Sequence, residues 1–254
     1  MIFESHAHYD DDAFDKDRHE LLDDFSDQGI EYVINIGSSI ENSKKTIELT
    51  KKYPFIYGSI GVHPSETKDL EEDDIAWLKD KASDDKVLAI GEIGLDYYWD
   101  TPDRDIQQHW FKRQLELAKE VNLPVVIHSR DAAQDTFNMV KDAGLDEYRG
   151  VLHCFSYTTE MAKKYVDMGY YIGVGGVVTF KNGRKLKEVV EAIPLDYILL
   201  ETDAPYLAPE PNRGKRNSSI NLKYIAAEIA KIKGVKYEEV LEITRNNGMK
   251  LFRI

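Results

Sequence analysis

The sequence contains a single cysteine, Cys154, so no disulfide can form within the chain. Its apolar runs are short, as in Val125-Val126-Ile127, whereas a helix that crosses a bilayer needs about 20 apolar residues. Residues 1–6 lack the basic and long apolar regions of a signal peptide. From these absences we expect a cytoplasmic protein that does not enter a membrane.

Positive charge is also scarce, because the sequence has 33 Lys and Arg but 46 Asp and Glu, which gives a net charge of −13. A surface that coats nucleic acid needs an excess of basic residues, so broad binding along a duplex is excluded. A nuclease is not excluded, since bound cations would add positive charge locally, where a phosphate would lie. Hydrophobic residues make up 42% of the 254 residues, which is enough for a large buried core.

Short β-rich runs alternate with longer helical patterns along the chain. The runs cover residues 2–8, 32–37, 56–62, 87–93, 124–128, 150–153, 170–174 and 197–201. Helical periodicity marks residues 104–121 and 223–233, and two final helical patterns lie near 220–232 and 237–251. Eight strands alternating with helices predict an α/β protein of the TIM-type (β/α)8 barrel class, with residues 1–254 as a single domain. An open doubly wound sheet is the alternative.

Nitrogen and oxygen donors gather at the ends of the predicted strands. Six of them form the candidate ligand set: His6, His8, Glu92, His128, His153 and Asp203. In a parallel barrel the carboxyl ends of the strands meet on one face, where the loops build the active site. We therefore expect these six side chains to meet in one pocket.

His6 and His8 lie two residues apart on one strand, so their side chains point to the same face and can bind one metal. Alone the pair is a weak signal, because two packed histidines would give the same pattern. Imidazole and carboxylate donors suit Zn²⁺, Mn²⁺, Co²⁺ or Fe²⁺, and carboxylates also admit Mg²⁺. Six ligands are too many for one tetrahedral ion, so we predict two divalent cations, with Glu92 as the natural bridge. Two such ions polarise an ester oxygen and lower the pKa of a shared water.

Six motifs occur in order along nearly the whole chain: residues 5–8 (SHAH), 61–64 (GVHP), 91–97 (GEIGLDY), 127–130 (IHSR), 153–156 (HCFS) and 201–206 (ETDAPY). This ordered set resembles the TatD family of metal-dependent deoxyribonucleases, a branch of the amidohydrolase superfamily of barrels. The resemblance implies hydrolysis of DNA phosphodiester bonds, of the 3′→5′ exonuclease type. It also implies that His6, His8 and Asp203 hold one cation with Glu92, and that Glu92, His128 and His153 hold the second.

The sequence departs from the family pattern at two places. Glu4 stands where the family often has Asp, and we expect a supporting or structural role for it. Ser218 and Ser219 stand where the family usually has Glu-Pro, and we expect serine caps on the first turn of the following helix.

Asp203 and Glu92 are the predicted catalytic residues. Asp203 is expected to accept a proton from the attacking water and to return it to the leaving oxygen. Glu201 either orients a ligand or lies in the barrel interior. His63 either contacts the scissile phosphate or has a structural role beside Pro64.

Further substrate contacts are expected from basic and aromatic loops. Arg130 can form a fork on a phosphate, and Arg213 belongs to a basic loop with Lys215 and Arg216 that either binds phosphate or is simply solvated. Four loop aromatics either stack on unpaired bases or pack under their loops: Tyr97, Tyr98, Trp99 and Tyr206. Residues 10–12, three consecutive aspartates, are expected in a solvated loop, and residues 71–74 at an acidic helix start.

The leading hypothesis is a divalent-metal-dependent DNase whose partner is DNA or an oligonucleotide, with no obligate protein partner. One alternative keeps the metals but cleaves a small ester, lactone, amide or phosphoester, because a fold does not fix a function. The other alternative is a metal-binding scaffold without turnover.

Overall fold

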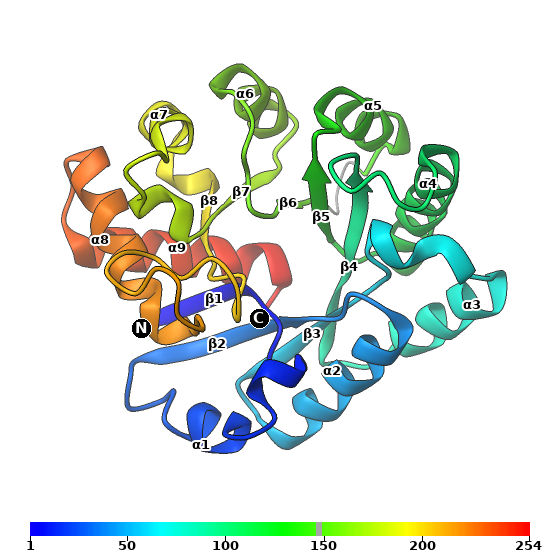
Figure 1. Cartoon of the computed structure of the whole chain (residues 1–254), viewed down its shortest axis with the longest axis horizontal. Helices are drawn as coiled ribbons and strands as arrows, with labels where there is room; N and C mark the ends of the chain where they lie inside the picture. The colour runs from blue at the N-terminus through cyan, green and yellow to red at the C-terminus, as the bar shows by residue number, and fades with distance from the viewer. Residues whose placement is uncertain (146–148) are drawn as a thin grey trace. The chain divides into compact units, whose positions relative to one another are not determined.

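The computed structural model describes residues 1–145 and 149–254, and strands alternate with helices along its chain (Figure 1). The strands are β1 Ile2–Ala7, β2 Ile30–Ile36, β3 Ile56–Ile60, β4 Val87–Asp96, β5 Val125–Arg130, β6 Gly150–Leu152, β7 Tyr171–Val174 and β8 Ile198–Leu200. The α-helices are α1 Arg18–Asp23, α2 Ile40–Lys52, α3 Glu72–Lys81, α4 Arg104–Val121, α5 Ala133–Ala143, α6 Thr159–Asp167, α7 Arg184–Ala192, α8 Leu222–Lys233 and α9 Tyr237–Phe252. Short 3₁₀ helices are η1 Asp12–Phe14, η2 Pro64–Asp69, η3 Gly176–Thr179, η4 Leu195–Tyr197 and η5 Ser219–Asn221.

The eight strands form one sheet in their sequence order, β1 to β8. The strand pairs β1–β2, β3–β4, β4–β5, β5–β6 and β7–β8 are parallel. A further parallel bridge joins Ala7 of β1 to Ala204, just after β8. This order is that of a TIM-type (β/α)8 barrel and differs from a doubly wound sheet, whose strand order reverses at a switch point. The predicted fold class is confirmed.

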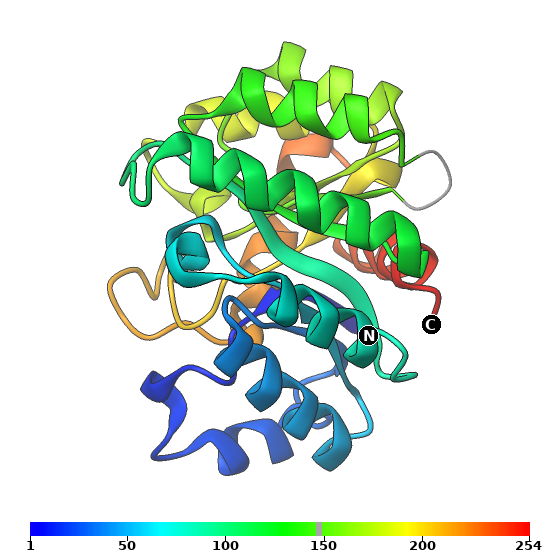
Figure 2. The same cartoon turned by 90° about the vertical axis from the view of Figure 1, so that its right-hand side faces the viewer.

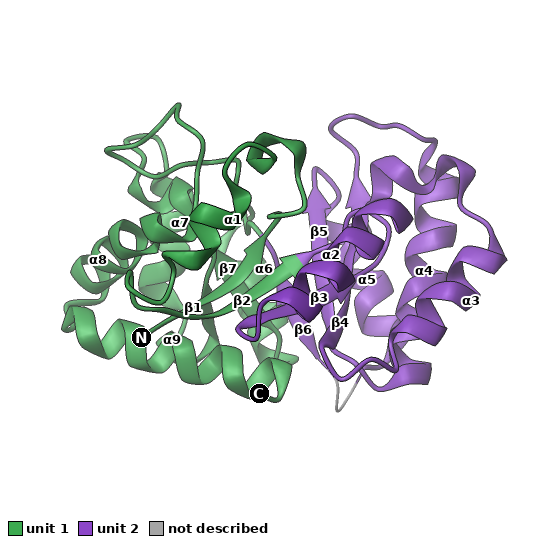
Figure 3. Cartoon of the chain, turned by 90° about the horizontal axis from the view of Figure 1, so that it is seen from below, with its two compact units in different colours: residues 1–35, 154–254 green, residues 36–153 purple. Residues whose placement is uncertain are grey.

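The chain divides into two compact units, residues 1–35 with 154–254 and residues 36–153 (Figure 3). In the first unit, helix α9 packs against β1, and the rings of Phe3 and Phe252 stack with their centroids 5.8 Å apart. Gly248 permits this approach, because a Cβ there would lie 2.7 Å from the ring of Phe3. The strand that carries His6 is thereby held by the C-terminal helix.

In the second unit, helices α4 and α5 lie side by side (Figure 2), and α4 packs on β4. Two buried glutamines of α4 bind the backbone of neighbouring segments. Gln107 accepts a hydrogen bond from Asp96 N at 2.9 Å and donates to Asp96 O at 3.1 Å. Gln114 accepts from Val62 N at 2.8 Å and donates to Val62 O at 3.0 Å. The glutamines are seven residues apart, about two helical turns, so one face of α4 anchors both segments.

Most predicted elements lie within a few residues of the observed ones, and helix α4 spans residues 104–121 as predicted. Strand β4 is longer than predicted, because Leu95 and Asp96 continue the ladder with Ser129 and Arg130 of β5. The acidic start of α3 is confirmed. Within the described part of the chain, no helix has the length and apolarity that a membrane span needs.

The expectation of a solvated aspartate loop is wrong for Asp10. Its side chain is only 2% exposed. The Asn35 amide donates to its Oδ1 at 2.8 Å, and burial raises its pKa. Asp11 fits the expectation better, since it caps the short helix η1 by accepting from Ala13 N at 2.7 Å.

Candidate metal centre

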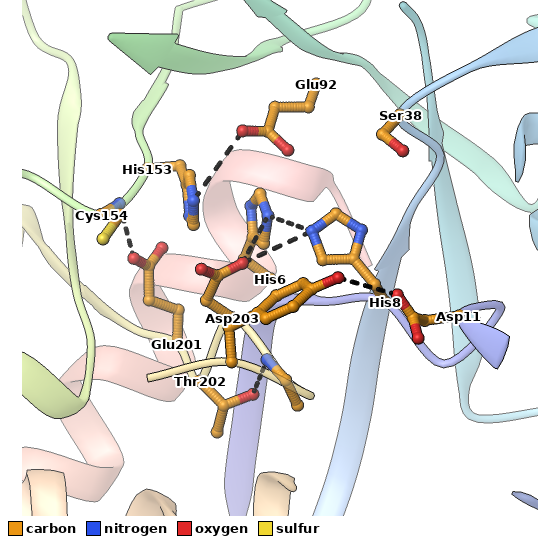
Figure 4. A network of polar contacts seen from close by, with 12 residues as sticks. His6, His8, Asp11, Ser38, Glu92, His153, Cys154, Glu201, Thr202 and Asp203 are labelled. Atoms are coloured by element: carbon orange, nitrogen blue, oxygen red, sulfur yellow. Dashed lines mark hydrogen bonds and ion pairs between the residues drawn. The ribbon is translucent and has the colours of Figure 1, made fainter. Parts of the chain in front are cut away.

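The first candidate cluster consists of His6, His8 and Asp203, which lie in the first unit (Figure 4). The backbone brings them together, because the segment after β8 continues the ladder along β1. Asp203 N donates to His6 O at 2.9 Å, and His8 N donates to Ala204 O at 2.8 Å. The alternation of β1 then points both imidazoles toward the Asp203 carboxylate, as the two-residue spacing predicted.

The spacing of these donor atoms fits one cation. His6 Nε2 lies 3.1 Å from His8 Nε2, and Asp203 Oδ1 lies 3.7 Å from His6 Nε2 and 3.4 Å from His8 Nε2. Ligand bonds of about 2.0–2.1 Å in a tetrahedral arrangement separate neighbouring donors by about 3.4 Å. The three distances scatter around that value, so the cluster has the dimensions of a three-ligand metal site.

Glu4 supports this cluster from inside the protein. Its buried carboxylate accepts hydrogen bonds from His6 N at 3.1 Å, from Thr202 N at 2.9 Å and from Thr202 Oγ1 at 2.6 Å. Ser219 Oγ adds a fourth at 2.8 Å. Burial raises the pKa of Glu4 to about 7, and these hydrogen bonds oppose the rise. Glu4 thus ties β1 to the residue before Asp203, in the supporting role predicted for it.

The expectation of serine caps after the eighth strand is wrong. Ser218 occupies the N-cap of η5 but makes no side-chain cap hydrogen bond. Ser219 also departs from a capping role, because its hydroxyl is directed at Glu4 and lies 2.7 Å from Tyr9 Oη. The buried carboxylate outcompetes the helix terminus, since hydrogen bonds to a charged group are the stronger ones.

The second candidate cluster lies in the second unit and centres on Glu92. Its Oε1 is 2.8 Å from His128 Nδ1, 3.9 Å from His63 Nε2 and 3.9 Å from His153 Nε2. Figure 4 shows the contact between Glu92 and His153. Strand β4 carries Glu92, His128 lies on β5, and His153 follows β6 directly. One carboxylate oxygen therefore faces three imidazoles, including that of His63, which was predicted as a substrate contact.

Asp96 completes the surroundings of His128, although it is absent from the predicted ligand set. Its Oδ2 lies 3.1 Å from His128 Nε2, so both ring nitrogens of His128 face carboxylates. Burial opposes protonation of the ring, but the hydrogen bonds to Asp96 and Glu92 outweigh it and raise the pKa of His128. Burial also disfavours the Asp96 carboxylate, but bonds from His128 and from Trp99 N and Tyr98 N lower its pKa. The four-residue spacing from Glu92 on one strand is the sequence signal for Asp96, because such residues share a face.

Glu201 and His63 have partners within their own units. Glu201 is buried, and its Oε1 accepts a hydrogen bond from Cys154 N at 2.6 Å. His63 Nδ1 accepts from Ser65 N at 3.2 Å, while its Nε2 faces Glu92. Each side chain is therefore fixed in orientation, and the ring of His63 presents one nitrogen to the Glu92 cluster.

The predicted basic contacts lie against aromatic rings. The guanidinium of Arg130 lies 3.7 Å from the centroid of the Tyr98 ring, and that of Arg213 lies 4.1 Å from the centroid of the Phe180 ring. The guanidinium of Arg216 likewise lies 4.7 Å from the centroid of the Phe14 ring, and it also forms a two-pronged ion pair with Asp17. Arg213 Nη1 lies 4.0 Å from Glu210 Oε1, so a carboxylate accompanies both arginines of the predicted phosphate loop.

Comparison with known proteins gives matches over the whole chain. The family model described as TatD related DNase matches residues 3–253. The chain is 43% identical over 254 residues to the metal-dependent hydrolase YabD of Bacillus subtilis, covering 100% of both chains. It is 34% identical over 258 residues to the metal-dependent hydrolase YcfH of Escherichia coli, covering 100% of this chain and 96% of that one. The crystal structure of YJJV, a TatD homolog from Escherichia coli, matches with a TM-score of 0.94 at 30% identity and covers 100% and 98% of the two chains.

Proposed function

Because the chain belongs to the TatD-related DNase family, we propose that this metal-dependent hydrolase cleaves the phosphodiester bonds of DNA and removes nucleotides from a 3′ end. Residues 1–254 act as one hydrolase domain in this proposal. The observation that carries it is the pair of carboxylate–imidazole clusters, around Asp203 and around Glu92. Both are built from residues at or just beyond strand ends, where barrel enzymes carry their active sites.

We propose that His6, His8 and Asp203 hold one divalent cation with Glu92, and that Glu92, His128 and His153 hold the second. The donor spacing of the first cluster and the convergence of imidazoles on Glu92 Oε1 support this assignment. Their nitrogen and oxygen chemistry suits Zn²⁺, Mn²⁺, Co²⁺, Fe²⁺ or Mg²⁺. When bound, two such cations supply charge that polarises the scissile phosphate and activates a water.

Asp203 is the proposed general base. Its side chain is 16% exposed, so one edge of the carboxylate reaches solvent while Oδ1 faces the two histidines. It accepts the proton of the attacking water and returns it to the 3′ oxygen of the penultimate nucleotide, which is the leaving group. Glu4 and Asp96 act as positioning residues, because their hydrogen bonds hold the His6 backbone and the His128 ring.

The test uses single-stranded DNA labelled at its 3′ end or its 5′ end, with Mg²⁺, Mn²⁺ or Zn²⁺. We expect the 3′ label to be released as a mononucleotide in the first step, while the 5′-labelled strand shortens one nucleotide at a time and keeps its label. Glu92→Gln and Asp203→Asn should each reduce the rate at least about 100-fold, whereas Asp73→Asn on the exposed start of α3 should leave it unchanged. Undiminished cleavage by both site variants would refute the assignment. Hydrolysis of p-nitrophenyl esters without any cleavage of DNA would favour a small-ester substrate.

A further inference from the structure

Two aromatic rings stand in solvent on the loop between β4 and α4. Tyr98 is 55% exposed and Trp99 is 66% exposed, which makes Trp99 the most exposed large hydrophobic side chain in residues 1–145 and 149–254. Their ring centroids are 5.1 Å apart, with the planes nearly perpendicular at 88°. Leaving this much aromatic surface in water is unfavourable, so a binding role is the natural explanation.

The loop that carries these rings is firmly held. Asp96 Oδ1 accepts hydrogen bonds from Tyr98 N at 3.0 Å and from Trp99 N at 3.1 Å. Gln107 donates to Pro102 O at 2.8 Å, within the same loop. The backbone of the loop is therefore held in place, which lowers the cost of ordering it when a ligand binds.

Positive charge accompanies the rings. The Arg130 side chain is exposed, and its guanidinium carbon lies 3.7 Å from the centroid of the Tyr98 ring. Arg104 lies 4.2 Å from the centroid of the adjacent Tyr97 ring, but Asp100 pairs with it through two hydrogen bonds, so Arg130 is the candidate cation for a phosphate. Proteins that bind single strands combine aromatic faces for the bases with cations for the phosphates. The protein as a whole is strongly acidic, so an exposed guanidinium beside exposed rings gives this loop a local cation that a phosphate could contact.

One carboxylate connects the loop to the candidate metal centre. Asp96 holds the loop backbone through Oδ1, while its Oδ2 lies 3.1 Å from His128 Nε2. His128 in turn contacts Glu92. A ligand on the rings would thus lie beside the second cluster and in a fixed relation to it.

We propose that Tyr98 and Trp99 form an aromatic platform in which an unpaired base of a single DNA strand stacks on the Trp99 ring, while Tyr98 packs against that ring and Arg130 binds a neighbouring phosphate. The proposal rests on the proposed function, since the stacked strand is the one that is cleaved. A base within a duplex is already stacked and paired, so the platform selects single-stranded ends. It thereby sets the register of the strand relative to the scissile bond.

The first experiment removes the ring and the base separately. Trp99→Ala should lower kcat/KM on a 3′-labelled oligonucleotide by about 5- to 150-fold, the range for one lost base stack. A single abasic nucleotide is placed in turn at each of the terminal positions of the oligonucleotide. At one of these positions it should lower the kcat/KM of the wild type by a similar factor. At that position Trp99→Ala should cause no further loss. Trp99→Phe keeps a stacking face and should restore most of the rate.

The second experiment measures binding without turnover. Adding an oligonucleotide of about ten nucleotides, in the presence of a chelator, should quench tryptophan fluorescence in the wild type. The quenching should disappear in Trp99→Phe, which retains Trp77 and Trp110. Trp77→Phe on α3 is the matched control and should keep it. The Trp99 variants should unfold at the wild-type temperature, because the side chain of Trp99 is largely exposed.

The outcomes separate the two proposals. If the wild type cleaves DNA and Trp99→Ala cleaves intact and abasic strands equally well, at the wild-type rate, the platform is overturned and the proposed function stands. If the wild type cleaves no DNA, the proposed function fails, and the fluorescence measurement still decides the platform. Equal cleavage of blunt duplex and single strands would also contradict the platform.

Discussion

Replacing Gln114 by Met tests how α4 supports the segment that leads to His63. The amide of Gln114 satisfies both the N–H and the C=O of Val62, at 2.8 and 3.0 Å, in a buried environment. Methionine has nearly the same volume, so no cavity forms, but neither backbone group retains that partner. An unsatisfied buried polar group costs about 1–3 kcal/mol, so two of them should lower the free energy of unfolding by about 2–6 kcal/mol.

That loss is large against a typical total of about 5–15 kcal/mol. Urea unfolding, extrapolated linearly to zero denaturant, measures it. Gln134→Met on α5 is the control, because Gln134 is exposed and bonds only to Asn138 in the same helix, and it should change stability by less than about 0.5 kcal/mol. If Gln114→Met is as stable as this control, the two hydrogen bonds of the Gln114 amide do not stabilise the folded protein.

Three further predictions concern stability. The hydrogen bond to Arg245 lowers the pKa of Glu31 below its usual 4.5, so the ion pair should contribute about 1 kcal/mol at neutral pH. This contribution is present above pH 4.5 and is lost as the pH falls through the lowered pKa, so Glu31→Gln should be less stable than the wild type at about pH 7, and urea unfolding should show the difference vanish in acid below that pKa. Gly94→Ala should prevent folding or cost at least about 3 kcal/mol, because a Cβ at φ +147° would lie 1.8 Å from the His128 carbonyl oxygen; circular dichroism during urea unfolding checks it. Chelation of divalent cations should lower Tm, since loss of a ligand present at 100 times its Kd removes about 2.7 kcal/mol, and a Tm unmoved by EDTA would contradict this.

The fold and much of the candidate site could be predicted from the periodicity of residues along helices and strands. Helix α4 repeats apolar residues along one face, so its limits at Arg104 and Val121 were predicted. The His6 and His8 spacing on a strand predicted their approach, and they do share one cluster with Asp203. Those features depend on local patterns, which a sequence carries directly.

Other features depend on pairing between distant segments. Gln107 and Gln114 resemble ordinary surface residues of a helix, and only tertiary structure reveals their bonds to the backbone at Asp96 and Val62. Asp10 was predicted in solvent because its neighbours are charged, yet Asn35 meets it in the interior. Partners with a separation of many residues leave no periodic signal, so these contacts were not predictable.

The two clusters together should bind a pair of divalent cations, and the metal content per chain measures this. After reconstitution with Mn²⁺ or Zn²⁺ and removal of excess ion, inductively coupled plasma mass spectrometry should find about two metal ions per chain in the wild type. His8→Ala and His128→Ala, which alter one cluster each, should each retain about one. A correctly folded wild type that binds no ion, or variants that keep the full wild-type content, would contradict the account.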